Sequence, residues 1–183
     1  MKLMIASDIH GSAYYCRKLL GRYDIEQPDQ LILLGDILYH GPRNALPKEY
    51  SPKDVIPMLN AIKDKILCVR GNCDSEVDQM VLDFPIMADY SLVYNGKIKL
   101  FVTHGHLYNL HTLPPLQPGE YLLHGHTHVP AWQPFGTNNT YLNPGSISIP
   151  KEDSPHSYMM ITDTAMTWKD LDGTTYHTLS IEA

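Results

Sequence analysis

The chain has 183 residues, 43% of them hydrophobic and 19% charged, as is usual for a soluble protein, and we expect a single domain over residues 1–183. Its formal net charge of −6 argues against a broad surface for long nucleic acid, although a local metal-filled cleft could still bind phosphate. Three cysteines without CxxC spacing argue against a disulfide framework, and no apolar stretch is long enough to span a membrane, so we expect a cytoplasmic protein.

Five apolar runs divide the chain, and each ends in a small residue followed by a polar one. They are residues 2–7, 31–35, 66–71, 99–103 and 120–125. Because the runs are continuous and do not alternate, they predict strands buried on both faces, in a parallel or mixed sheet covered by helices. Residues 11–23 have helical apolar spacing, and residues 51–64 begin with Ser51 as a helix cap followed by Pro52. The first two-thirds of the chain therefore has a βαβ-like order.

Hairpin signals follow Tyr90. Asn95-Gly96 and Asp172-Gly173 each separate two strand-like runs, and both dipeptides are typical of tight β-turns. The C-terminal part is therefore predicted to contain antiparallel strands that form a second sheet packed on the first.

A polar residue stands directly after each of the five apolar runs, where the predicted strand ends. These residues are Asp8, Asp36, Asn72, His104 and His126. In open α/β sheets the carboxyl ends of the strands form the ligand-binding crevice. We therefore expect the five side chains to converge there.

Asp8 and His126 are each followed by a histidine at the second position, as His104 is by His106, and we take Asp8/His10 and His126/His128 as ligand pairs. Residues two apart in extended backbone point to the same side, so each pair can present two ligands to a common site. Seven candidate ligands are too many for one metal ion and suit two ions, especially if a carboxylate bridges them. The alternative is that these polar side chains cap turns at the strand ends.

The segments "DIHG", "GDILYHG", "GNCD", "THGH" and "GHTH", in this order and followed by "NPGS" at residues 143–146, resemble the calcineurin-like metallophosphoesterase superfamily. Within it they are similar to short bacterial phosphodiesterases. Each segment alone is a weak signal, but five in order at predicted strand ends are specific. The resemblance covers residues 8 to about 150. It implies an α/β fold in which a two-layer mixed β-sandwich is flanked by α-helices.

The resemblance also implies two divalent metal ions per chain and assigns their ligands. One ion would be held by Asp8, His10 and His128, the other by Asn72, His104 and His126, and Asp36 would bridge both. Such a pair clamps a phosphoryl group and lowers the pKa of a shared water, which yields hydroxide for in-line attack on phosphorus. Carboxylate, amide and imidazole ligands suit Mn²⁺, which we expect, or Zn²⁺, Fe²⁺ or Co²⁺, better than Mg²⁺.

Two positions depart from the superfamily pattern. Cys73 stands where relatives commonly have a histidine that binds substrate or protonates the leaving group, and a thiol beside two cations would tend toward thiolate. His40 stands where many relatives have arginine, and it is a candidate phosphate contact of weaker charge. Arg43 is a second candidate for substrate binding, with a structural ion pair as the alternative. His106 is a candidate substrate contact or proton donor, with a hydrogen bond inside its loop as the alternative.

These residues predict a metal-dependent phosphodiesterase that acts on a small phosphodiester, with Asp36, Asn72, Cys73 and His106 closest to the reaction. A rival from another class is a catalytically idle scaffold of the same fold that binds proteins, as the small subunit of retromer does. The acidic charge weighs against a nuclease, and Cys73 weighs against a monoesterase. Relatives often form homo-oligomers, which leaves the oligomeric state of this chain open.

Overall fold

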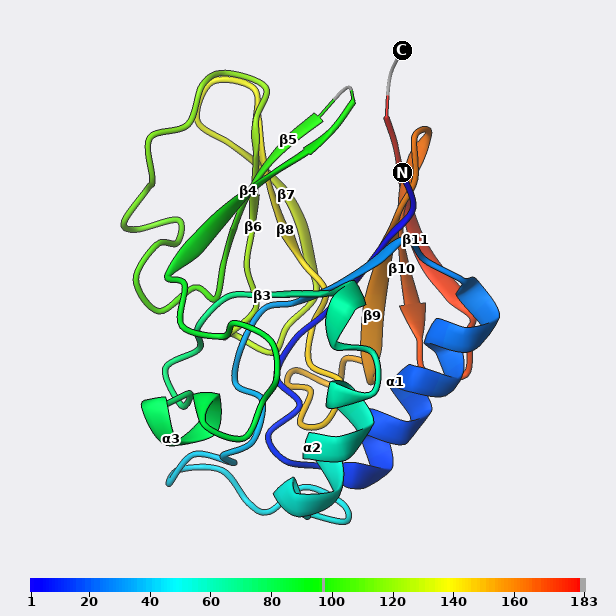
Figure 1. Cartoon of the computed structure of the whole chain (residues 1–183). Coiled ribbons are helices and arrows are strands. Elements are labelled where there is room, and N and C mark those ends of the chain that lie inside the picture. Colours follow the sequence, from blue (N-terminus) through cyan, green and yellow to red (C-terminus); the bar gives the residue numbers. More distant parts are fainter. Residues whose placement is uncertain (97, 182–183) are drawn as a thin grey trace.

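The first of two sheets contains six strands in the order β11-β10-β9-β1-β2-β3 in a computed structural model, which describes residues 1–96 and 98–181 (Figure 1). Its strands are β1 (Leu3–Ala6), β2 (Gln30–Leu33), β3 (Ile66–Cys68), β9 (Ser157–Ile161), β10 (Ala165–Asp170) and β11 (Thr175–Ser180). β1, β2 and β3 run parallel, which confirms the βαβ-like order of the N-terminal part. β9 pairs antiparallel with β1, and β10 and β11 continue that side of the sheet.

The second sheet contains five strands in the order β4-β5-β6-β8-β7. They are β4 (Tyr90–Asn95), β5 (Ile98–Thr103), β6 (Tyr121–Leu123), β7 (Ala131–Phe135) and β8 (Asn139–Asn143). β5, β6 and β8 are parallel, and the two edge strands, β4 and β7, are antiparallel to their neighbours. The second sheet is therefore also mixed.

Both predicted hairpins are confirmed, but the sheet assigned to the second one is wrong. Asn95 pairs with Ile98 across the first turn, and Gly173, at a φ of +96°, lies in the turn between β10 and β11. The β10–β11 hairpin belongs to the first sheet, because β9 occupies the edge of β1 that β2 leaves free. A hairpin signal describes local turn geometry and does not indicate which distant strand will receive the pair.

In the described part of the chain, helices cover only the first of the two sheets. They are α1 (Ala13–Glu26), α2 (Pro52–Asn60), α3 (Glu76–Gln79) and the short 3-10 helix Lys63–Lys65. Ser12 caps α1 by accepting a hydrogen bond from the Tyr15 amide, and Ser51 and Pro52 begin α2 as predicted. The buried faces of α1 and α2 pack on the outer face of the first sheet, where Leu19 and Leu59 join one cluster with Met4 and Leu31. No helix within residues 1–96 and 98–181 has the length and hydropathy needed to cross a bilayer.

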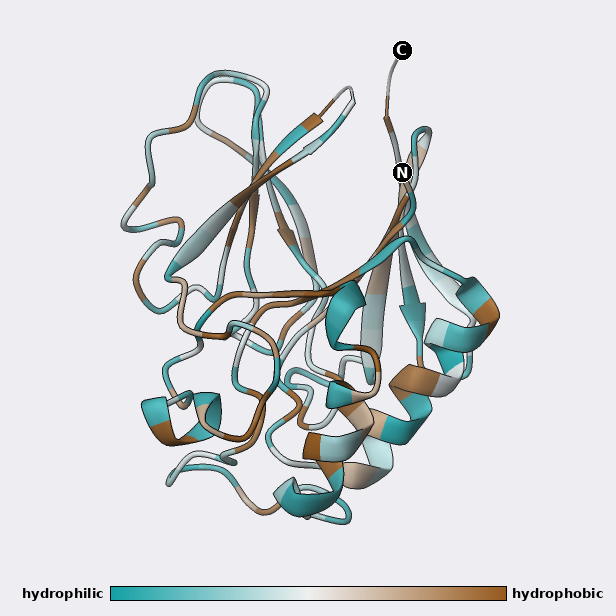
Figure 2. Ribbon diagram, viewed as in Figure 1, coloured by the Kyte–Doolittle hydropathy of each residue, from teal (hydrophilic) through white to brown (hydrophobic). Residues whose placement is uncertain are grey.

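A second apolar cluster fills the space between the two sheets and joins them. Leu3 and Ile32 of the first sheet meet Leu100 and Leu142 of the second, and the hydrophobic strand segments lie where the sheets face each other (Figure 2). Trp168 is fully buried in this cluster, and its indole N–H donates to the carbonyl oxygen of Asn143 at 2.7 Å. This sandwich with flanking helices is the predicted fold class, and it holds the strand ends of both sheets in fixed relative positions.

We expect Leu100→Ala to lower the free energy of unfolding by about 2–5 kcal/mol, because the side chain is 0% exposed between the sheets and its removal leaves a cavity. Leu92→Ala is the matched control, since Leu92 lies on the neighbouring strand β4 but is 43% exposed, and its loss should be within about 0.5 kcal/mol. Urea unfolding followed by circular dichroism measures both. Equal losses in the two variants would contradict the proposed core.

Candidate metal centre

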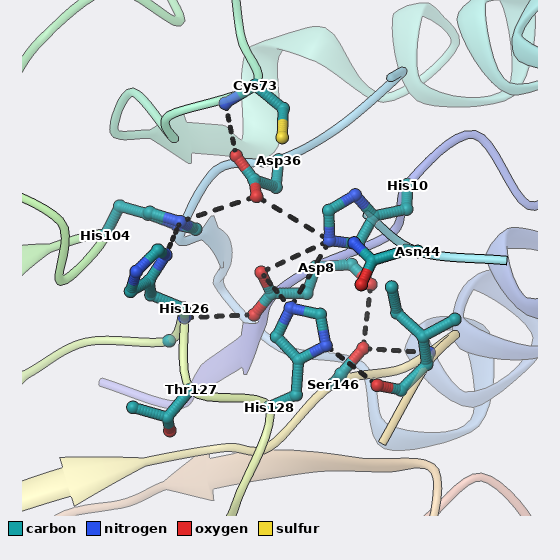
Figure 3. A network of polar contacts seen from close by, with 12 residues as sticks. Asp8, His10, Asp36, Asn44, Cys73, His104, His126, Thr127, His128 and Ser146 are labelled. Atoms are coloured by element: carbon teal, nitrogen blue, oxygen red, sulfur yellow. Dashed lines mark hydrogen bonds and ion pairs between the residues drawn. The ribbon is translucent and has the colours of Figure 1, made fainter. Parts of the chain in front are cut away.

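All seven predicted ligands lie where strands of the two sheets end. Asp8, Asp36 and Asn72 follow β1, β2 and β3 of the first sheet, while His104 and His126 follow β5 and β6 of the second. Asp8, His10, Asp36, His104, His126 and His128 point toward a common centre (Figure 3). The predicted convergence therefore takes place at the junction of the two sheets.

The first group of ligand atoms contains Asp8, His10 and His128. The His10 and His128 Nε2 atoms lie 3.4 Å apart, and they lie 3.7 and 3.3 Å, respectively, from the Asp8 carboxylate oxygen Oδ1. Each ring nitrogen Nδ1 lies 2.8 Å from a backbone carbonyl oxygen, that of Tyr39 for His10 and that of Ile149 for His128. Donation of Nδ1–H to a carbonyl leaves each Nε2 with its lone pair directed into the group.

The second group contains Asn72, His104 and His126. His104 Nε2 lies 3.1 Å from the Asn72 side-chain oxygen and 3.1 Å from His126 Nδ1. His104 Nδ1 lies 2.7 Å from the carbonyl oxygen of Leu34, which again leaves Nε2 as the acceptor. Three acceptor atoms therefore converge here too.

Asp36 lies between the two groups. Its Oδ2 atom lies 3.6 Å from His10 Nε2 and 3.5 Å from His104 Nε2. Its other oxygen, Oδ1, accepts a hydrogen bond of 2.8 Å from the Cys73 amide. One carboxylate thus contacts both groups, as a bridging ligand would.

The backbone at five of these residues is left-handed, so the reason given for the two residue pairs is wrong. The φ angles are 58° for Asp8, 48° for His10, 56° for Asp36, 65° for His126 and 63° for His128. Only a few per cent of non-glycine residues have positive φ, and each such position costs of order 1–3 kcal/mol. The two members of each pair therefore reach the site from tight turns and not from extended backbone.

Close packing explains why two of the apolar runs end in glycine. A Cβ atom on Gly71 would lie 2.1 Å from Asp36 Oδ1, and one on Gly125 would lie 1.9 Å from the Ser7 hydroxyl and 2.8 Å from Asp8 Oδ2. No side chain fits at either position. The turns can therefore bring two strand ends against the carboxylates only with glycine before Asn72 and before His126.

Asp74 supports the site, although the sequence did not assign it a role. Its buried carboxylate accepts hydrogen bonds from the backbone amides of Asp36, Ile37 and Gly71 at 2.7–2.8 Å. Burial raises the pKa of this carboxyl above its usual value, against the effect of those hydrogen bonds. The signal that could have identified it is its place in "GNCD", two residues after Asn72.

The charges of the first group are coupled. Burial by itself would raise the pKa of Asp8, but the close contact with His128 and the surrounding imidazoles hold that pKa below its usual value. Burial likewise lowers the pKa of His128, and the Asp8 carboxylate outweighs this effect and raises it. Asp8 is therefore ionised at neutral pH, as a metal ligand must be.

The donor set fits divalent cations. Asp8 Oδ1 is buried and makes no hydrogen bond of normal geometry within residues 1–96 and 98–181, and its neighbours are the Nε2 atoms of His10 and His128, which bind metals in their neutral form. Among the described residues, the combinations Asp8/His10/His128 and Asp8/Asp36/His104 each bring three ligand atoms within 4.8 Å of one another. Without a cation the Asp8 carboxylate favours a proton on His128, and cations bound among these groups would compensate the carboxylate charges and displace that proton.

A cavity of about 380 Å³ opens onto these residues. It is lined by His10, Asp36, Gly41, Pro42, Arg43, Asn44, Asn72, Cys73, His126, His128 and Lys151. Asn44 and Lys151 were missed by sequence reasoning, since Asn44 lies in a proline-rich loop and Lys151 lies after the last motif. The predicted contact Arg43 is part of the lining and is exposed.

His40 lies away from the cavity lining. Its ring packs edge-on against Tyr39 and Tyr50, with ring centroids 4.8 and 5.1 Å away, because these aromatic side chains surround the turn after β2. The structure thus gives no support to His40 as a phosphate contact. Arg70, a further arginine near the strand ends, forms an ion pair of 2.7 Å with Asp89.

The two candidate proton donors, His106 and Cys73, differ in how their surroundings change their pKa values. His106 packs beside His104, with ring centroids 5.4 Å apart, and burial followed by the charges of His104 and His126 lowers its pKa to about 4. His106 is therefore neutral at pH 7 and suits hydrogen bonding better than acid catalysis. Burial and the carboxylates of Asp36 and Asp74 raise the pKa of Cys73 to about 12, which opposes the thiolate that nearby cations would favour.

Comparisons with known proteins identify the family of the chain. Residues 1–166 match the calcineurin-like phosphoesterase superfamily domain. The chain is 48% identical over 166 residues to phosphodiesterase YfcE of Escherichia coli (strain K12), an alignment that covers 91% of this chain and 90% of that protein. The solved structure of YfcE, a phosphoesterase from E. coli, covers 100% of both chains with a TM-score of 0.95 and 45% identity.

A Vps29 variant from Entamoeba histolytica shares the fold alone, with a TM-score of 0.63 and 19% identity over 100% of both chains. The match to the family over residues 1–166 and the 48% identity to YfcE show a shared family in addition to a shared fold. The chain belongs to the calcineurin-like phosphoesterase superfamily.

Proposed function

We propose that the protein is a divalent-metal-dependent phosphodiesterase that hydrolyses small phosphodiesters. The observation that carries this proposal is the pair of converging acceptor groups that share the Asp36 carboxylate. The similarity to a phosphodiesterase at 48% identity supports the reaction class. The net charge of −6 favours a small substrate over long nucleic acid.

In this proposal one ion binds Asp8, His10 and His128, and the second binds Asn72, His104 and His126. Asp36 binds both ions, consistent with its similar distances of 3.6 and 3.5 Å to the two groups. Oxygen and imidazole ligands favour Mn²⁺, with Zn²⁺, Fe²⁺ and Co²⁺ as alternatives. Two such ions clamp a phosphoryl group and make hydroxide available as a nucleophile at neutral pH.

Side chains of the protein would hold the ligand groups in place and position the substrate. Asp36, held by the Cys73 amide and by Asp74 through its own amide, keeps the two ligand groups in register. Arg43 and Lys151 supply positive charge to the wall of the cavity, where the phosphodiester oxygens and the departing alcohol would lie. Because Cys73 and a neutral His106 are weak acids, the leaving group should depart with little help, which favours activated diesters over monoesters.

A cytoplasmic location is also part of the proposal. Cys16 and Cys68 are buried free thiols, and Cys73 is a free thiol at the cavity. Free thiols beside a metal centre persist best in a reducing compartment.

Metal-stripped protein should hydrolyse bis-p-nitrophenyl phosphate only after Mn²⁺ is added. Asp36→Asn should reduce this turnover by roughly two to three orders of magnitude, as loss of one group that stabilises the transition state does in other hydrolytic sites. Asp83→Asn removes an exposed carboxylate paired with Lys63 and is the control that should keep full activity. Mn²⁺ binding without turnover of any phosphoester would favour the idle scaffold instead.

Cys73→His should raise hydrolysis of a phosphodiester with an alkyl leaving group relative to bis-p-nitrophenyl phosphate by about tenfold or more, because an alkoxide needs the proton that an imidazole can donate and p-nitrophenolate does not. Cys73→Ser keeps the size of the side chain without adding an acid, so its ratio of alkyl to p-nitrophenyl ester activity should stay unchanged. The rates of both substrates at several pH values measure the effect. An equal rise in both variants would show that only the thiol was inhibitory.

Arg43→Ala should raise KM for the diester about two- to fivefold with kcat nearly unchanged, because an exposed ion pair contributes up to about 1 kcal/mol. The matched control is Arg17→Ala, which removes an exposed arginine of α1 that is paired with Glu49. Steady-state kinetics separates the two constants. A fall in kcat with unchanged KM would argue that Arg43 acts on the transition state and not on substrate binding.

A further inference from the structure

The segment Asn143–Ile149 has no role in the proposed reaction, yet it lies directly beneath the turn that carries Asp8. It connects β8 to the region before β9 and contains the "NPGS" motif. Ser146 and Ser148 are 0% and 4% exposed, so their hydroxyl groups must find partners inside the protein. Those partners lie on the strand end that carries a proposed ligand.

Both serine hydroxyls donate to the same atom, the backbone carbonyl oxygen of Asp8, at 3.0 Å from Ser146 and 2.8 Å from Ser148 (Figure 3 shows Ser146). The Ile147 amide donates to the preceding carbonyl, that of Ser7, at 3.2 Å. Two consecutive carbonyl groups at the end of β1 are therefore held from one side. The second of them belongs to a residue with a φ of 58°, which a free chain rarely adopts.

The same segment also holds a second proposed ligand of the same ion. Ser146 Oγ accepts hydrogen bonds from the Ser148 and Ile149 amides at 3.2 and 3.0 Å, which fixes the backbone at Ile149. The Ile149 carbonyl oxygen lies 2.8 Å from His128 Nδ1 and sets the direction of that ring. Ser146 thus connects the Asp8 turn with the His128 ring through two short steps.

We infer that Ser146 and Ser148 are positioning residues for the ion that Asp8, His10 and His128 would hold. The inference rests on the proposed function. The carboxylate of Asp8 can reach the ion only while its backbone keeps the left-handed turn. The two hydroxyls stabilise this turn because they donate to the Asp8 carbonyl oxygen, which is buried there. Their effect should fall mainly on this ion, because His104 of the other group is held by the Leu34 carbonyl after β2, and the Asp8 carboxylate touches that group only through the His126 amide at 3.2 Å.

The test is titration of metal-stripped protein with Mn²⁺, followed by calorimetry and by electron paramagnetic resonance of bound Mn²⁺. Ser148→Ala should weaken one of the two Mn²⁺ sites by roughly ten- to a hundredfold, the usual effect of losing a group that orients a ligand, and weaken the other site much less. Ser157→Ala is the matched control, since Ser157 is equally buried and its hydroxyl bonds at 2.6 Å to Pro144 in the same segment, away from the ligands.

Circular dichroism and thermal melting of each variant separate folding from positioning. If Ser148→Ala fails to fold, Ser148→Cys fills the same space with a weaker donor and should weaken the same Mn²⁺ site by a smaller factor. Unchanged binding of both ions in the folded Ser148 variants, or equal weakening of both ions, would overturn the inference. Failure of the unsubstituted protein to bind Mn²⁺ at all would instead overturn the proposed function on which the inference rests.

Discussion

Burial of two carboxylates at one site is the constraint on which this structure depends. The carboxylates of Asp8 and Asp36 face ring nitrogens whose other nitrogen already contacts a backbone carbonyl. Without compensating cations or protons, two carboxylates at one site repel each other and would separate on a flexible backbone. Here the carbonyls of Leu34, Tyr39 and Ile149 fix the rings, and three backbone amides fix Asp74 under Asp36. The centre is therefore preorganised by backbone groups more than by side chains.

The two sheets share this centre, and neither sheet could build it alone. Asp8 and Asp36 come from the first sheet, while His104 and His126 come from the second. Their distances depend on the apolar cluster between the sheets, where Trp168 also holds the carbonyl of Asn143. Packing far from the cavity therefore sets the geometry of the ligands. The left-handed turns, each costing of order 1–3 kcal/mol, are tolerated because this frame is rigid.

Most features that the sequence predicted depend on neighbouring residues or on the place of a residue at the end of a strand. Continuous apolar runs followed by a polar residue predicted both the parallel strands and the residues at their ends, because hydrophobic pattern and strand position are set by neighbouring residues. The order of the motifs then predicted the family and the fold class. The ligand roles of the seven residues stay predictions, although the structure brings all of them together.

What could not be predicted depends on distant contacts. The pairing of β9 with β1 joins residues more than 150 positions apart, and no local pattern encodes it. The left-handed turns and the roles of Asp74 and Lys151 depend on which backbone groups meet in space. His40 stays a prediction, because its ring packs against Tyr39 and Tyr50 and is not part of the cavity lining.

The pairing of β9 with β1 has a consequence for how the chain folds. β1 leaves the ribosome well before the strand that covers one of its edges, because more than 150 residues separate their paired positions. Until β9 arrives, β1 exposes unpaired amides and carbonyls, the kind of edge that invites pairing with another chain. Contacts of such long sequence separation also close slowly. The nascent protein therefore cannot complete the Asp8 turn before the serines that hold its carbonyl, Ser146 and Ser148, have been synthesised, so catalytic competence should be acquired late in the folding of this domain.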